Sequence, residues 1–213
     1  MGRALATPEE EFANTLTHGF GLFISVCGFA VLMFLAQQQG DFWRTISCGI
    51  YGSSLVILYA ASTCYHGVTC LERKRIFKIV DHCAIYLLIA GSYTPFTLIA
   101  LQGPWGWKMF YAIWALACMG IVFKLFFTGR FERLSTAIYL LMGWMAILAI
   151  EELFVALSYE GLFWLIAGGL FYSAGVIFYV REKPRYHHAI WHLFVLTGSV
   201  CHYVSILFYV LLA

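Results

Sequence analysis

The sequence has few charged residues and no CxxC motif. Charged residues make up 11% of the 213 residues, and the net charge is only +2, whereas soluble proteins usually contain about 25% charged residues. These values exclude an intrinsically disordered chain and a strongly basic nucleic-acid-binding protein. Seven cysteines are present, but none forms a CxxC pair. We therefore expect neither a disulfide framework nor a cysteine-based zinc site.

Hydrophobic residues, in contrast, are very abundant. They account for 62% of the chain, aromatic residues account for 18%, and the mean hydropathy is +0.82. A soluble domain of this size cannot bury so much apolar surface in one core. The composition therefore predicts an integral protein of the cell membrane (inner or plasma membrane) with several membrane-spanning segments.

Seven stretches of the sequence are suited to cross a bilayer as helices, which takes about 20 mostly apolar residues. They lack the alternation of β-barrel strands. The fourth contains Lys124, whose long side chain we expect to reach the interface. We predict an all-α seven-helix transmembrane bundle that forms one domain over residues 1–213. The stretches are Phe20–Ala36, Thr45–Cys64, Ile79–Leu101, Met109–Phe127, Leu134–Ile150, Leu162–Val180 and Ala189–Ala213.

Lysine and arginine are distributed unevenly between the two ends of these helices. Only Arg44 and Lys108 fall on one side. Basic residues concentrate on the cytoplasmic side of membrane proteins, so we predict a cytoplasmic N-terminus and an external C-terminus. The other side holds eleven of the 13 basic residues, namely Arg3, Arg73, Lys74, Arg75, Lys78, Lys124, Arg130, Arg133, Arg181, Lys183 and Arg185.

The residues ahead of the first apolar stretch contain a helix start. The sequence Thr7-Pro8-Glu9-Glu10 combines a capping box with proline at the first helical position, so we expect no cleavable signal peptide. Phe12, Leu16 and Phe20 then recur at every fourth residue. Residues 1–19 are therefore either a short amphipathic helix on the inner leaflet or an extension of the first span.

Several ionisable residues lie where a bilayer tolerates them poorly, since each costs at least a few kcal/mol to insert. The second span ends at Ser62 and His66, the third begins at Asp81, and the seventh begins at His188 and His192. In the predicted topology these residues all lie at cytoplasmic helix ends and at similar depth. We therefore expect their side chains to lie close together.

Three of these residues suit metal binding. His188 and His192 are four residues apart and share a helix face. The positive end of the helix dipole disfavours a protonated imidazole there, so both rings should stay neutral. With His66 they offer three nitrogen ligands and leave a fourth position for water, the ligand count of a catalytic zinc site. Asp81 is then placed to orient that water or act as its base, and Ser62 to hydrogen-bond with either.

Each residue also has a simpler explanation. The histidine pair lacks the glutamate of the HExxH motif, and a lone intramembrane histidine commonly hydrogen-bonds a neighbour. Asp81 is equally placed to form a salt bridge with Lys78. The metal-site hypothesis depends on the convergence of these residues at one depth.

In these same regions the sequence resembles the hemolysin III family of bacterial membrane proteins, within the wider progestin and adipoQ receptor superfamily. The matching stretches keep their order and spacing over the whole chain. They are Glu10–Gly21 (EEFANTLTHGFG), Ala61–His66 (ASTCYH), Asp81–Phe96 (DHCAIYLLIAGSYTPF), Gly120–Lys124 (GIVFK), Tyr139–Trp144 (YLLMGW), Tyr172–Val180 (YSAGVIFYV) and His188–Tyr203 (HAIWHLFVLTGSVCHY).

The resemblance implies a seven-helix fold with an internal N-terminus and a zinc ion near the cytoplasmic face. In the superfamily, one histidine of the second helix and two of the seventh hold the zinc, and these roles fall on His66, His188 and His192. The family aspartate that contacts zinc through water matches Asp81. The serine one turn before the first ligand matches Ser62, which makes these two the candidate catalytic residues.

The remaining histidines are harder to place. His202 also matches a family position, but it lies ~15 Å beyond His192 along a helix. It is therefore a residue behind the ligands or part of a polar cavity. His18 reaches the site only if the first helix packs beside the seventh, and otherwise is an interfacial residue. His82 lies near the same inner boundary, and we expect His187 to face water.

Three functions are open on this basis. The first is zinc-dependent hydrolysis of membrane lipid amides or esters, because related seven-helix superfamilies resemble ceramidases and three histidines with a water suit attack on a carbonyl. The second is a sensor of membrane state or regulator of lipid homeostasis, with a structural zinc. The third is a pore-forming cytolysin or an ion or proton conductor. The expected partners are membrane lipids, including a lipid substrate, and no nucleic acid; the oligomeric state is left open.

Overall fold

The long apolar stretches form helices, and no strand occurs in the part of the chain that the computed structural model describes, residues 6–181 and 185–213. Seven helical spans are long and apolar enough to cross a membrane. This confirms the all-α seven-helix class. The spans are α1 (Pro8–Gln38), α2 (Phe42–Gly67), α3 (Leu71–Pro95) with η1 (Phe96–Leu101), α4 (Gly103–Phe127), α5 (Glu132–Gly143) with η2 (Met145–Ala149) and α6 (Ile150–Ala156), α7 (Tyr159–Val180), and α8 (His187–Ile206) with η3 (Leu207–Leu211).

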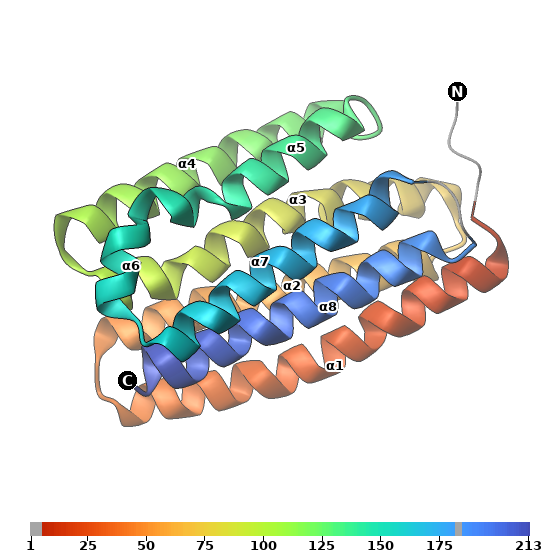
Figure 1. Cartoon of the computed structure of the whole chain (residues 1–213). Coiled ribbons are helices and arrows are strands. Elements are labelled where there is room, and N and C mark those ends of the chain that lie inside the picture. The colour runs from red at the N-terminus through yellow and green to blue at the C-terminus, as the bar shows by residue number, and fades with distance from the viewer. Residues whose placement is uncertain (1–5, 182–184) are drawn as a thin grey trace.

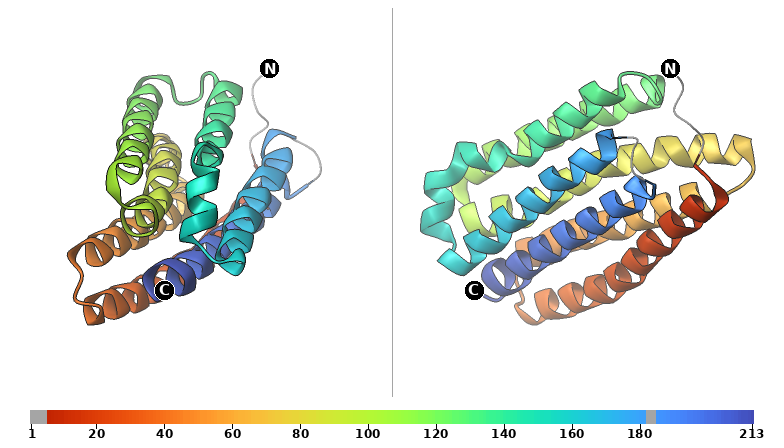
Figure 2. Two further views of the ribbon diagram at one scale, coloured as in Figure 1. Left: turned by 60° about the vertical axis from the view of Figure 1, so that its left-hand side comes forward. Right: turned by 45° about the vertical axis from the view of Figure 1, so that its right-hand side comes forward.

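Consecutive spans run antiparallel, so the start of α1 and the end of η3 lie at opposite ends of the bundle (Figure 1). The α4 and α5 helices lie on the side of the bundle away from α1 in both views of Figure 2.

Close contact between α1 and α2 depends on glycine, because a Cβ at Gly21 would lie 2.5 Å from the Tyr59 ring, and one at Gly52 would lie 2.2 Å from the Phe29 ring. Small residues let membrane helices approach in this way.

The first helix begins at the predicted capping box. The Thr7 hydroxyl accepts from the Glu10 amide, and the Glu10 carboxylate accepts from the Thr7 amide. From Pro8 the helix continues unbroken to Gln38, so residues 8–19 form its first turns and are continuous with the first span. Their apolar side chains point outward, and their polar face lies against the bundle.

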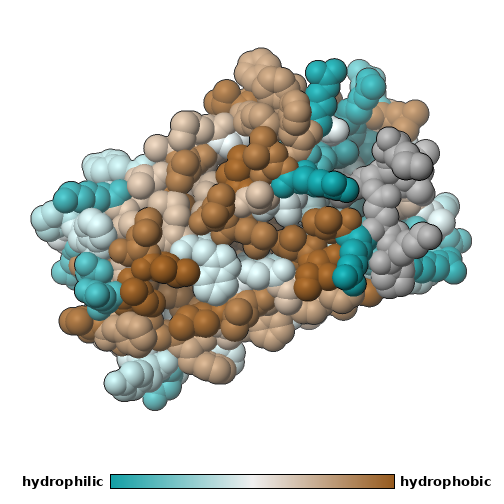
Figure 3. Space-filling view, turned by 45° about the horizontal axis from the view of Figure 1, so that its top comes forward, coloured by the Kyte–Doolittle hydropathy of each residue, from teal (hydrophilic) through white to brown (hydrophobic). Residues whose placement is uncertain are grey.

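The outer surface is suited to lipid. Large apolar side chains are exposed along the helices, among them Phe23, Met119 and Phe171. Figure 3 shows that such side chains dominate the middle of one face, whereas hydrophilic residues gather towards its two ends. Described basic residues of the predicted cytoplasmic set lie at the helix ends nearest the start of α1. Arg3 and Lys183 lie outside the described residues, and the orientation of the termini stays a prediction.

The fifth span differs from the predicted single helix over Leu134–Ile150, because it breaks after Gly143. The Tyr93 hydroxyl of α3 donates to the Gly143 carbonyl and accepts from the Ala146 amide, both at 2.8 Å. The Trp144 indole donates to Ser173 of α7 at 3.0 Å. Backbone groups freed inside a membrane need such partners, and these hydrogen bonds therefore stabilise the break beside the interior of the bundle.

The prediction that Lys124 extends to the interface is wrong. Its side chain is 0% exposed, and its ammonium donates to Glu132 Oε2 at 2.9 Å. The same oxygen lies 3.7 Å from His82 Nδ1 of α3, and Glu132 also accepts from the Gly129 amide. A carboxylate at the start of α5 therefore makes burial tolerable for a cation that would otherwise have moved to the surface.

We expect Glu132→Gln to destabilise the protein, because it leaves the Lys124 cation buried without its counter-ion. Removing one partner of a buried pair costs about 3 kcal/mol, and the partial exposure of Glu132 makes the lower part of the measured range appropriate. Thermal unfolding in detergent measures the effect, with the exposure of the buried thiols Cys48 and Cys201 to a thiol-reactive dye as the signal. Glu152→Gln, at an exposed site, is the control, and equal melting temperatures for the two variants would refute the prediction.

Candidate metal site

Three histidines converge at one end of the bundle. His66 lies in the last turn of α2, and His188 and His192 lie in the first turns of α8, at the same end (Figure 1). One ligand atom from each ring lies within 4.8 Å of those of the other two. The ring centroids are 5.0 Å apart for His66 and His188, and 4.6 Å apart for the two rings of α8.

Local structure fixes these positions. Val68 is extended and ends α2 just beyond His66. Tyr186 adopts a left-handed φ of 61°, and its amide donates to Glu10 of α1 at 3.2 Å. The chain therefore turns immediately before His187, so that α8 begins with its histidines facing the end of α2.

The three histidines fit a zinc ion by the chemistry of their donors. The His66 and His192 side chains are buried, and His188 is half-buried. The Nε2 atom of His66 is buried and has no hydrogen-bond partner among the described residues, although buried polar nitrogens almost always have one. Imidazole nitrogens are common zinc ligands, and three of them leave an open position.

Asp81 and Ser62 lie beside this group. Both are buried and both line the cavity that the histidines border. The Ser62 hydroxyl interacts with the Asp81 carboxyl and lies 2.7 Å from His18 Nδ1. The structure therefore brings together all five predicted site residues, while their roles as ligands and catalytic groups stay predictions.

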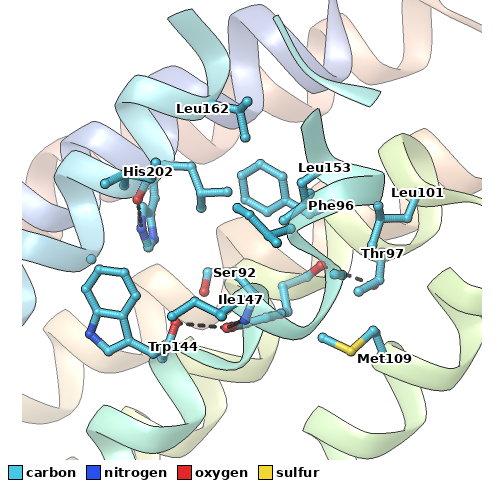
Figure 4. Close-up of a pocket in the computed structure, with 18 residues that line it drawn as sticks. Ser92, Phe96, Thr97, Leu101, Met109, Trp144, Ile147, Leu153, Leu162 and His202 are labelled. Atoms are coloured by element: carbon cyan, nitrogen blue, oxygen red, sulfur yellow. Dashed lines mark hydrogen bonds between the residues drawn. The ribbon is translucent and has the colours of Figure 1, made fainter. Parts of the chain in front are cut away.

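The cavity has a volume of about 410 Å³. Its polar end holds the three histidines, Asp81 and Ser62, and its walls become apolar farther into the bundle. It adjoins a smaller cavity of about 70 Å³, since both are lined by Ser92, Trp144 and His202. Figure 4 shows His202 and Trp144 on one side of the smaller cavity and Leu101 and Met109 on the other. Further apolar lining residues of the main cavity are Leu58, Ile85, Leu88, Ile89, Val176 and Val195.

Comparison with known proteins identifies the family. Residues 6–203 match the sequence model of the family described as "Haemolysin-III related". The chain belongs to the hemolysin III family. It is 46% identical over 211 residues to "Hemolysin-3" of Bacillus cereus, covering 99% of this chain and 96% of that protein. Family membership and the seven spans together establish a multi-pass protein of the cell membrane.

More distant relatives belong to the wider superfamily. The chain is 33% identical over 213 residues to the human "Monocyte to macrophage differentiation factor", covering 96% of this chain and 86% of that protein. It is 25% identical over 222 residues to the "Adiponectin receptor protein" of Drosophila melanogaster, covering 92% of this chain and 50% of that protein. The resemblance to the hemolysin III family within the progestin and adipoQ receptor superfamily is thus confirmed.

The other histidines of this family member have distinct places. His18 is buried and stacks on His192, with ring centroids 3.5 Å apart, because α1 packs against α8. His82 lines the cavity and faces Glu132 rather than the three-histidine group. The expectation that His187 faces water is wrong, since it is half-buried with Nδ1 3.1 Å from the Phe178 carbonyl oxygen.

His202 lies between the two cavities. Its Nε2 donates to the Leu165 carbonyl at 3.2 Å, and its ring lies against Tyr172 at 5.4 Å. It is not part of the three-histidine group, as its distance along the helix predicted. The surroundings are more apolar than the expected polar cavity, because Leu153, Leu162 and Phe96 line the smaller cavity beside it.

The sequence analysis missed three residues of α1 that contact the ligand rings, namely Glu11, Asn14 and Thr17. The spacing Glu11, Asn14, His18 places polar side chains on one face of a helix, opposite the apolar Phe12, Leu16 and Phe20. That pattern predicts a buried polar face. It does not reveal which helices the face meets.

Proposed function

We propose that this protein is a zinc-dependent hydrolase of membrane lipid amides or esters. The observation that carries the proposal is the position of the three histidines at the polar end of a cavity that is otherwise mainly apolar. In the proposed reaction a lipid carbonyl binds at the polar end and its aliphatic chain lies along the walls. A lipid fits this combination better than a soluble metabolite.

When bound, zinc supplies Lewis-acid chemistry, polarising a carbonyl and making water a better nucleophile at neutral pH. The residues of the chain supply the rest. The Asp81 carboxylate accepts the proton that the attacking water gives up and passes it to the departing amine or alcohol. The Ser62 hydroxyl, in contact with both Asp81 and His18, holds the carboxylate in place.

The apolar walls have two tasks in this mechanism. They take up the acyl chain, and they keep bulk water away from the polar end, where electrostatic interactions are then stronger. The smaller cavity beyond Trp144 and His202 extends the apolar path towards the end of the bundle opposite the three histidines. Its position suits the end of a long acyl chain.

The proposal is tested with purified protein in lipid vesicles that contain a panel of N-acyl amides and acyl esters. We expect turnover of at least one lipid, a loss of more than about 100-fold after zinc chelation because several kcal/mol of transition-state stabilisation disappear, and recovery when zinc is returned. His192→Ala protein, treated identically, is the control for contaminating hydrolases. Absence of turnover with the zinc-loaded protein across the whole panel would contradict the proposal.

A second function, regulation through a structural zinc, is favoured by one observation. The ligands come from α2 and α8, two spans far apart in sequence, so a bound metal would join them. A variant that binds zinc but cannot hydrolyse lipid, and still retains full activity in cells, would favour this function over hydrolysis. The third alternative is a pore-forming cytolysin, an activity that the name of the B. cereus relative suggests for that protein. Leakage of a dye from the same vesicles tests this alternative.

A further inference from the structure

One face of α1 lies against the ligand rings without belonging to the three-histidine group. Glu11, Asn14 and Thr17 are three residues apart and therefore share this face. Each contacts an Nδ1 atom of His66 or His192. These contacts lie on Nδ1, so they hold each ring without occupying its Nε2.

The Glu11 carboxylate is the nearest partner of His66. Its Oε2 lies 2.6 Å from Nδ1, whereas the Asn14 amide nitrogen lies 3.4 Å from the same atom. A carboxylate only accepts, so Nδ1 must carry the hydrogen and donate it. The Nε2 atom of a neutral ring then holds the lone pair. This is the atom that is buried without a hydrogen-bond partner among the described residues.

His192 is held in the same way by backbone. Its Nδ1 lies 3.2 Å from the Asn14 carbonyl oxygen, which only accepts, and 3.0 Å from the Thr17 hydroxyl. That hydroxyl lies 2.9 Å from the same Asn14 carbonyl and donates to the α1 backbone, so its oxygen is available to accept from the ring. Two rings from different helices therefore present Nε2 lone pairs because of one helix, α1.

The Glu11 carboxylate is itself fixed from α3. Its second oxygen, Oε1, accepts from the Lys74 ammonium at 2.9 Å, and the same ammonium donates to the Tyr65 carbonyl at 3.2 Å. The His66 side chain is 5% exposed, and those of Glu11 and Lys74 are 23% and 24% exposed. The carboxylate thus bridges three helices with both oxygens in use, which leaves it little freedom to turn.

We propose that Glu11 is a positioning residue for the metal, acting through His66. It fixes the ring orientation and the tautomer that direct Nε2 at the ion, and Lys74 holds Glu11 in place for that task. The inference rests on the proposed zinc site and deepens it, because it gives α1 a part in metal affinity although α1 supplies no member of the three-histidine group.

The test is the zinc affinity of detergent-purified protein, measured by competition with a chromophoric chelator. Glu11→Gln keeps the size of the side chain but removes the charge, and we expect affinity to fall by about 10- to 100-fold, the usual effect of losing such a partner. Lys74→Met should lower affinity by a smaller factor. Glu9→Gln is the matched control, because Glu9 lies in the same turn of α1 but is 64% exposed.

Melting temperatures of the zinc-free proteins separate positioning from a structural role. Without zinc, we expect Glu11→Gln to melt below wild-type protein only as far as Lys74→Met does, because both variants lose the same ion pair, and we expect zinc to raise the melting temperature of Glu11→Gln less than that of wild-type protein. Affinity of Glu11→Gln equal to that of Glu9→Gln would overturn the positioning role alone. Absence of zinc binding in wild-type protein would overturn the proposed function as well. If Glu11→Gln does not fold, Lys74→Met decides, and unchanged affinity in that variant would overturn the inference.

Discussion

Protein with alanine in place of both His188 and His192 should contain almost no zinc, whereas wild-type protein should contain about one zinc per chain. The two rings provide two of the three nitrogens that lie within 4.8 Å of one another. A single remaining imidazole holds zinc too weakly to survive purification. Mass spectrometry of protein grown with ample zinc and purified without chelators measures the metal content.

The matched control for this double variant is His187→Ala. His187 is the same residue type on the same helix, but it faces the Phe178 carbonyl and is not part of the three-histidine group. It should retain the metal. Wild-type protein without zinc would show that the histidines form a hydrogen-bonded cluster of another kind. A double variant that keeps zinc would show that the metal binds elsewhere in the protein.

The residues of this candidate site were predictable because two simple rules applied to them. The spacing of His188 and His192 places both on one helix face, whatever that helix contacts. The alternation of seven spans places the end of α2 and the starts of α3 and α8 on one side of the membrane, and the uneven distribution of lysine and arginine predicts that this side is cytoplasmic. The depth of the site residues along the membrane normal therefore follows from the sequence without knowledge of how the helices pack.

Features that depend on lateral packing were not predictable in this way. A lysine near the end of a span has the same sequence context whether it extends to the interface or is buried, so the pairing of Lys124 with Glu132 appears only in three dimensions. The break after Gly143 depends on the Tyr93 hydroxyl of another span. Likewise, the contact between Glu11 and His66 requires the direction in which α1 faces, which periodicity alone leaves undetermined.

Replacing Asp81 by asparagine should lower the rate of lipid hydrolysis by about 10²- to 10⁴-fold, the usual contribution of a general base. The amide keeps the size of the side chain and its contact with Ser62 but cannot accept the proton from water. Zinc content should stay at about one per chain, because Asp81 is not a member of the three-histidine group. This pairing of retained metal and lost turnover is the result that a catalytic zinc requires.

The control for Asp81→Asn is Glu152→Gln, which removes an acidic charge at an exposed position on α6. It should leave both zinc content and turnover unchanged. Loss of zinc together with activity in Asp81→Asn would mean that the carboxylate supports the metal and not the reaction. Full turnover with zinc retained would remove Asp81 from the mechanism, because it would show that another group activates the water. Retained metal with turnover reduced in Asp81→Asn alone leaves proton transfer as the step at which the buried carboxylate acts.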